Sequence, residues 1–198
     1  MWQYLDIHSN VSSQLFRSPG VFNDAAHKNG VLTAAYYFID WASSVTSTSD
    51  AGKPLYELSK KENGKFKYAK KLIQLMKYYG IDGMAFNPEG YFSSDLNTQF
   101  QEFLAECHRI AEEEEDWHFH VDWYGYVSNS GNLTDGGSTL TTNHSNWFHN
   151  DASGYPVTDV YFLNYNWSEG SLQTSVNVAK SKKRSPFDVY AGFDQQGR

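Results

Sequence analysis

The feature that most constrains the fold of this 198-residue chain is a succession of short apolar runs, each followed by a polar loop or an amphipathic segment. Short apolar runs between turn residues are typical of buried strands, and apolar residues at helical spacing are typical of amphipathic helices. Strands are predicted at residues 2–8, 31–39, 81–86, 117–126, 159–166 and 188–193. Helices are predicted at residues 19–29, 65–79, 95–115 and 172–181, with a short one near 145–148.

Strands that alternate with helices indicate successive βα units and a parallel sheet. Polar and aromatic residues that interrupt the apolar pattern fall where these strands end, which is where a (β/α)8 barrel carries its chemistry. A complete barrel has eight units in about 250 residues, whereas this chain provides six predicted strands. We therefore predict an α/β fold, a TIM-type barrel with about six of its eight βα units. Residues 1–198 are expected to form a single domain that lacks the last two units.

Charge and composition limit the possible partners. The net charge of −7 argues against nucleic acid, whose binding needs a basic surface. No apolar run approaches the roughly 20 residues of a membrane span, so no membrane insertion is expected. The N-terminus leads directly into the first predicted strand, so no signal peptide is expected in this stretch. Aromatic residues make up 17% of the chain; they can bind sugar rings, and they can equally fill the core of a barrel.

The most informative polar residues are Asn87 and Glu89, which follow the apolar run 81–86. Their spacing of two places both side chains on one face of a strand, and Pro88 between them favours the end of that strand. A carboxyl group in an aromatic cleft has a raised pKa and suits a general acid. An amide beside it can hold a substrate acetamido group, which suits substrate-assisted sugar hydrolysis. The simpler alternative is a strand-end turn in which Asn87 caps backbone donors.

A second polar pattern, His118-x-His120-x-Asp122, has a spacing that could place metal ligands on one strand face. Alternating polar residues also form hydrogen-bonded layers inside barrels, and no further ligand cluster is evident in the sequence. We therefore predict no metal site. On the same face, Tyr124 could donate a hydrogen bond to an acetamido group or orient Glu89, or it could be a core tyrosine with a satisfied hydroxyl.

Further candidates lie at or beside predicted strand ends, where they could contact sugar or simply pack in loops. These candidate substrate-binding residues are Trp41, Trp123, Asn164, Tyr165, Trp167 and Asp194. The single cysteine, Cys107, lies on the apolar stripe of the predicted helix 95–115 and is expected to be a core residue.

Five stretches in chain order resemble glycoside hydrolase family 85: DAAHKNGV, YGIDGMAFNPE, VDWYG, FLNYNW and VYAGFDQQGR. The resemblance covers nearly the whole chain, from about Trp2 to Arg198. It implies a (β/α)8 catalytic domain that cuts between the two GlcNAc residues in the core of N-linked glycans or glycoproteins. It implies an extracellular or periplasmic location in a bacterium and a cytosolic one in an animal. The sequence indicates no oligomeric state.

The resemblance also assigns roles to individual residues. It implies that Glu89 is the general acid/base, that Asn87 stabilises the acetamido group as an oxazoline-type intermediate forms, and that Tyr124 assists at the same centre. It implies that Trp167 lines the sugar site and that no metal or cofactor takes part. The chain departs from the family pattern at Gly125, where an aspartate is usual.

Two other readings remain. Family 18-type chitinases and endoglycosidases carry DGxDxDxE on one strand, and DGMAFNPE here has Ala85 and Asn87 in place of two of the aspartates. A non-catalytic protein that binds N-glycans is the alternative from a different class.

Overall fold

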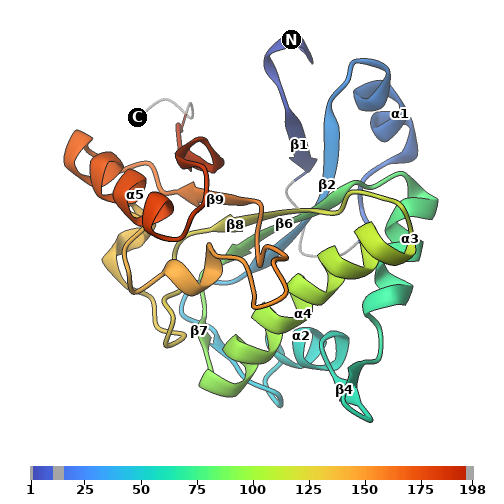
Figure 1. Ribbon diagram of the computed structural model, residues 1–198, viewed down its shortest axis with the longest axis horizontal. Helices are drawn as coiled ribbons and strands as arrows, with labels where there is room; N and C mark the ends of the chain where they lie inside the picture. The colour runs from blue at the N-terminus through green and yellow to red at the C-terminus, as the bar shows by residue number, and fades with distance from the viewer. Residues whose placement is uncertain (1, 11–15, 195–198) are drawn as a thin grey trace.

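The computed structural model describes residues 2–10 and 16–194, and its central feature is a six-stranded parallel sheet (Figure 1). The strands lie side by side in chain order, and every neighbouring pair is parallel. They are β1 (Ile7–Asn10), β2 (Leu32–Ile39), β6 (Gly83–Pro88), β8 (His120–Tyr124), β9 (Val160–Leu163) and β10 (Val189–Ala191). Parallel neighbours require long crossover connections. Predicted helices lie in four of them, whereas residues 125–159, between β8 and β9, contain only two 3-10 turns.

The helices pack on the sheet through apolar faces. They are α1 (Gly20–Lys28), α2 (Lys53–Leu58), α3 (Ala69–Tyr79), α4 (Ser94–Glu114) and α5 (Glu169–Ser181). Helices α3 and α4 run side by side (Figure 1). The buried side of α3 carries Leu72, Ile73 and Met76 at helical spacing, and Gly80 ends the helix at φ 64°. A glycine just past a helix adopts this left-handed conformation without a Cβ clash, so the predicted helix stop is confirmed.

Short elements complete the chain. They are the strands β3 (Ser44–Val45), β4 (Lys61–Glu62), β5 (Lys65–Phe66) and β7 (Tyr91–Phe92), and the 3-10 turns Trp2–Tyr4, Asp135–Gly137, Ser145–Trp147 and Pro186–Asp188. Strand β3 pairs with β7, and β4 pairs with β5. Among the described residues, no helix is long and apolar enough to cross a membrane.

Two predicted boundaries are wrong. The first strand begins at Ile7, because residues 2–4 form a 3-10 turn in which the Trp2 ring packs against Phe22 of α1, 5.5 Å between centroids. The helix predicted from residue 65 begins at Ala69. Residues 61–66 form a hairpin instead, since Asn63 and Gly64 both have positive φ, as a two-residue type I′ turn requires.

The core lies between the sheet and the helices and is rich in aromatic rings. Phe86 of β6 packs edge-on against Phe100 of α4, with centroids 5.3 Å apart. Trp123 of β8 stacks on Trp147 with centroids 3.6 Å apart and planes 11° apart. Cys107 is fully buried, as expected, and burial raises the pKa of its thiol.

Two matching histidine–aspartate contacts join elements at the N-terminal end of the sheet. His27 Nε2 of α1 lies 2.7 Å from Asp82 Oδ2, and His108 Nε2 of α4 lies 2.8 Å from Asp159 Oδ2. Each aspartate directly precedes a strand and also accepts a backbone N–H of the neighbouring strand at 2.7 Å. Each contact therefore links one helix to two adjacent strands.

Candidate active site

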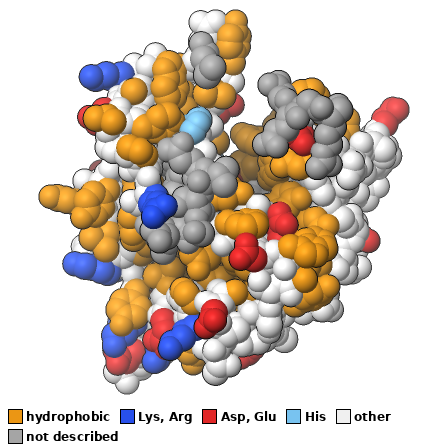
Figure 2. All heavy atoms as spheres, turned by 180° about the vertical axis from the view of Figure 1, so that it is seen from behind, with side chains coloured by type: hydrophobic (Ala, Val, Ile, Leu, Met, Phe, Trp, Pro, Cys, Tyr) orange, Lys and Arg blue, Asp and Glu red, His pale blue; other side chains and the backbone are white. Residues whose placement is uncertain are grey.

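A cavity of about 440 Å³ lies at the sheet and is lined by residues from the first strand to the last. Figure 2 shows the molecule from behind, with hydrophobic side chains gathered near the middle of this face and acidic ones among them. The cavity is lined by Tyr4, Leu5, Asp6, Ile7, Ser9, Tyr36, Ala85, Phe86, Asn87, Glu89, Asp122, Tyr124, Val160, Phe162, Tyr165 and Tyr190. A wall of aromatic and aliphatic side chains with a few polar groups is typical of a small-molecule site.

Asn87 and Glu89 both line this cavity, on either side of Pro88, which ends β6. The two-residue period of a strand turns both side chains to the same face. The backbone at Glu89 is fixed on both sides. Its N–H donates to the Ile39 carbonyl at 3.1 Å, and its carbonyl accepts the Ala42 N–H at 2.8 Å. The acid is therefore held by β2 and by the loop that follows β2.

The pKa of Glu89 is raised above its ordinary value. Burial is the largest cause, and the negative charge of Asp40 adds to it, while a hydrogen bond from Asn87 acts in the opposite direction. A carboxyl group with a raised pKa holds its proton to higher pH, so Glu89 is suited to donate a proton.

The Asn87 amide has one free hydrogen-bonding atom in this site. Its side chain hydrogen-bonds with Glu89 and with Tyr36 of β2. Its buried Oδ1 has no hydrogen-bond partner among the described residues. Unpaired buried acceptors are rare in folded proteins, and each calls for an explanation. A ligand N–H placed in the cavity would satisfy this oxygen.

Two tyrosine hydroxyls from the flanking strands complete the polar centre. Tyr124 of β8 has a pKa raised well above its ordinary value, first by burial and then by the charge of Glu89. Burial likewise raises the pKa of Tyr36. Both hydroxyls thus stay protonated at neutral pH and can donate hydrogen bonds. Sequence reasoning missed Tyr36, although its position in the run 31–39 gave a signal: residues at even positions share one strand face.

The predicted substrate-binding residues differ in their position relative to the cavity. Tyr165 lines the cavity. Trp41 does not, but it is 59% exposed and packs edge-on against Tyr126, whose pKa is raised by burial and by Glu89. The next residue, Ala42, donates its N–H to the Glu89 carbonyl, so the Trp41 backbone lies close to that of the acid. Trp167 does not line the cavity either; its Nε1 donates to the Gly192 carbonyl at 2.7 Å, and the residue is 37% exposed.

Three further predicted residues, Trp123, Asn164 and Asp194, also do not line the cavity. Trp123 is fully buried on the opposite face of β8, stacked on Trp147, so its proposed contact with sugar is corrected to a core role. Asn164 uses its side chain locally, since Nδ2 donates to the Gly136 carbonyl at 2.7 Å and Oδ1 accepts the next backbone N–H. Asp194 is exposed and does not line the cavity.

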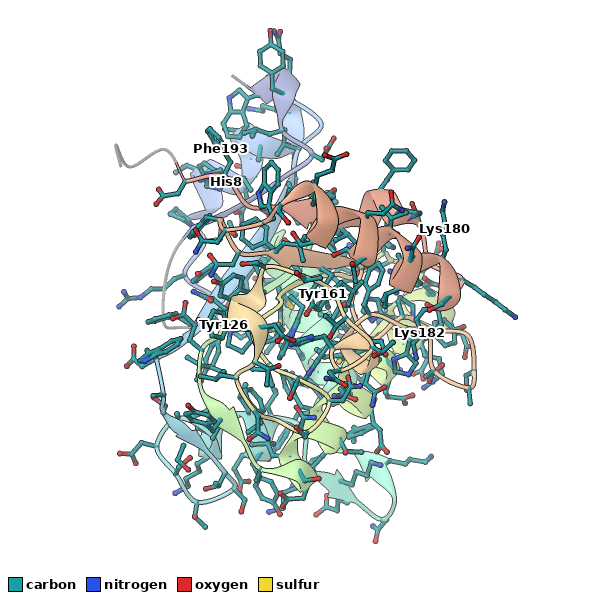
Figure 3. The ribbon with its side chains drawn as sticks, turned by 90° about the vertical axis from the view of Figure 1, so that its left-hand side faces the viewer. His8, Tyr126, Tyr161, Lys180, Lys182 and Phe193 are labelled. Atoms are coloured by element: carbon teal, nitrogen blue, oxygen red, sulfur yellow. The ribbon has the colours of Figure 1, made fainter. Side chains whose placement is uncertain are left out.

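Gly125 follows Tyr124, and its surroundings explain the missing side chain. A Cβ at this position would overlap the ring of Tyr161. Tyr161, labelled in Figure 3, is fully buried, and its hydroxyl donates to the Gly125 carbonyl at 3.0 Å. The Tyr161 ring thus fills the space beside the end of β8 and fixes the backbone next to Tyr124.

The parallel sheet, with its polar residues gathered where the strands end, defines a barrel of the TIM type, present here as six consecutive strands. Residues 1–198 match the family model described as "Glycosyl hydrolase family 85". The chain belongs to glycosyl hydrolase family 85.

Relatives and solved structures agree with this assignment. The cytosolic endo-beta-N-acetylglucosaminidase of Danio rerio is 29% identical over 194 residues, which cover 98% of this chain and 25% of that protein. Cytosolic endo-beta-N-acetylglucosaminidase 2 of Arabidopsis thaliana is 28% identical over 200 residues, which cover 100% of this chain and 26% of that protein. The glycoside hydrolase domain of Endo-D from Streptococcus pneumoniae R6 superposes with a TM-score of 0.83 at 26% identity, covering 98% of this chain and 30% of that one. The chain thus spans about a quarter of the length of its curated relatives.

Proposed function

We propose that this protein is an endo-β-N-acetylglucosaminidase that hydrolyses the GlcNAc-β-1,4-GlcNAc bond in the core of N-linked glycans by a retaining, substrate-assisted mechanism. The observation that carries the proposal is the pair formed by Asn87, with its unpaired buried Oδ1, and Glu89, with its raised pKa. The names of the curated relatives support the same activity class.

The first step uses Glu89 as the acid. Its proton passes to the glycosidic oxygen as the bond to the anomeric carbon breaks, and the carbonyl oxygen of the substrate's own 2-acetamido group attacks that carbon. The acetamido N–H donates to Asn87 Oδ1, which aligns the group for attack. The Tyr124 hydroxyl donates a hydrogen bond to the same group. The product of this step is an oxazoline-type intermediate.

The second step reverses the role of Glu89. Its carboxylate now takes a proton from water, which opens the oxazoline from the face that the leaving sugar occupied. Two displacements at one carbon retain the anomeric configuration.

The strand register argues against Asp122 as a protein nucleophile. Asp122 lines the cavity, but it pairs with Ala85, four residues before Glu89. Four residues of strand span roughly 13 Å. The two carboxyl groups of a direct double displacement lie only about 5–5.5 Å apart. Asp122 also binds His120 Nε2 through Oδ1 at 2.8 Å. It is therefore poorly placed to attack the anomeric carbon.

The position of cleavage tests the proposal. The protein should convert an N-glycopeptide to a peptide that keeps a single GlcNAc, with the β-anomer of the released glycan appearing first in NMR spectra. Membership of family 85 leaves the family 18-type alternative without support. The non-catalytic alternative predicts glycan binding with no release, and with Glu89→Gln leaving the affinity unchanged.

A further inference from the structure

We propose that the N-terminal ends of β8 and β9 form a binding site for a single Zn²⁺ ion, built from His118, His120 and Asp159. One ligand atom from each of these residues lies within 4.8 Å of the others. Imidazole nitrogen with one carboxylate oxygen is a ligand set that suits zinc, and three protein ligands leave a fourth position for water. Moderate movement of the exposed His118 side chain would close the three atoms onto one ion.

Each of the two less exposed ligands already has the partner that a metal ligand requires. His120 Nε2 lies 2.8 Å from Asp122 Oδ1, so the proton resides on Nε2 and Nδ1 keeps its lone pair for a cation. A carboxylate behind a metal-binding histidine is the common arrangement in zinc sites, because it fixes the tautomer and the ring orientation.

Asp159 is also oriented by hydrogen-bond partners. His108 Nε2 at 2.8 Å and the Val121 N–H at 2.7 Å both contact its Oδ2, which leaves Oδ1 for the ion. His108 Nδ1 lies 2.8 Å from the Leu104 carbonyl, so both ring nitrogens of this buried side chain face acceptors. The carboxylate is thus held in place from the protein interior.

The surrounding charges favour a cation. Asp82, Asp122 and Asp159 all act on His120. Asp188 also lies within electrostatic reach of His120. The opposing positive groups are Arg184, which binds the Asp159 backbone carbonyl at 2.9 Å, and His108, which acts on Asp159. The four aspartates outnumber these two groups around the proposed ligands.

The proposed zinc site is separate from the candidate active site. His120 pairs with Gly83, at the beginning of β6, while Glu89 follows its end. Six residues of strand separate the two levels by roughly 20 Å. The N-terminal face of such a barrel contributes stability and the opposite face carries the chemistry. We therefore assign the ion a structural role, in which it ties β8 to β9.

Calorimetric titration of the chelator-treated protein with ZnCl₂ tests the proposal. We expect one site per chain and a melting temperature that rises by roughly 5–10 °C when free zinc exceeds the Kd a hundredfold. MgCl₂ should give neither effect, since magnesium prefers all-oxygen ligands. Asp122→Asn should weaken zinc binding roughly 10–100-fold.

The exposed His118 provides the cleanest variant. His118→Ala should lose at least as much zinc affinity as Asp122→Asn while leaving the melting temperature of the metal-free protein unchanged. His149→Ala is the matched control, because His149 lies outside the cluster, and it should bind zinc as the unchanged protein does. Absence of zinc binding, or zinc binding that His118→Ala leaves intact, would overturn the proposal.

Discussion

The Tyr161 hydroxyl donates a hydrogen bond to the carbonyl of Gly125 at 3.0 Å, and its ring lies against the Cα of that glycine. This contact ties β9 to the end of β8, one residue after Tyr124. It also leaves no room for a side chain at position 125.

A side chain at position 125 should therefore destabilise the protein. Gly125→Ala should lower the free energy of unfolding by about 1–3 kcal/mol, because the added methyl group forces the Tyr161 ring out of a filled core. Denaturant unfolding measures this loss. Combining Gly125→Ala with Tyr161→Leu should restore part of it relative to the sum of the two single changes. Strict additivity of the two changes would show that ring and methyl group do not compete for the same space.

The two tryptophans predicted to contact sugar should differ in what they support. Trp123→Ala should cost about 3–5 kcal/mol of stability, since it empties a fully buried site next to Trp147. Trp41→Ala removes an exposed ring and should change stability by less than about 0.5 kcal/mol. Only the second variant should raise KM for a glycopeptide with its stability unchanged. An unaltered KM would remove Trp41 from the site.

The charge of Asp40 should set the pH range of activity. Because Asp40 helps to raise the pKa of Glu89, Asp40→Asn should lower that pKa. The general acid then loses its proton at lower pH, so the alkaline limb of the kcat/KM profile should move to lower pH, while activity on the acid side persists. A loss of activity at every pH would instead mark Asp40 as a nucleophile, and the substrate-assisted route would then be wrong.

Much of the fold followed from apolar periodicity. The strands at 31–39 and 81–86 and the helices α1, α4 and α5 are confirmed to within a few residues, because their apolar faces are long enough to reveal a period. The segments that were missed are short. Helix α2 has only six residues, too few to reveal a period. Strands β3 and β7 are held by pairing with each other, and a two-residue strand has no period to detect.

Only part of the candidate active site could be predicted from the sequence, because the pattern of strand residues is not equally informative at every position. Asn87, Glu89, Tyr124 and Tyr165 line the cavity, and their strand-end positions predicted that placement. Tyr36 was missed because it lies within a run of apolar residues. There, only the alternation of strand residues between the two faces of the sheet tells which side chains face the cavity. Trp123 was predicted to contact substrate, although the same alternation places it on the face of β8 opposite Tyr124. Asp159 belongs to a different strand from His118 and His120, so no spacing in the sequence could reveal their proximity.

The most direct test of the central claim compares two substrates with Asn87→Ala. If Asn87 aligns the acetamido group for the first step, this variant should lose roughly 10²–10³-fold in glycopeptide hydrolysis. It should still consume a preformed sugar oxazoline at close to the unchanged rate, because that substrate bypasses the first step. Glu89→Gln, which lacks the base for the second step as well, should be slow on both. Oxazoline turnover that falls as far as glycopeptide hydrolysis in Asn87→Ala would contradict the account.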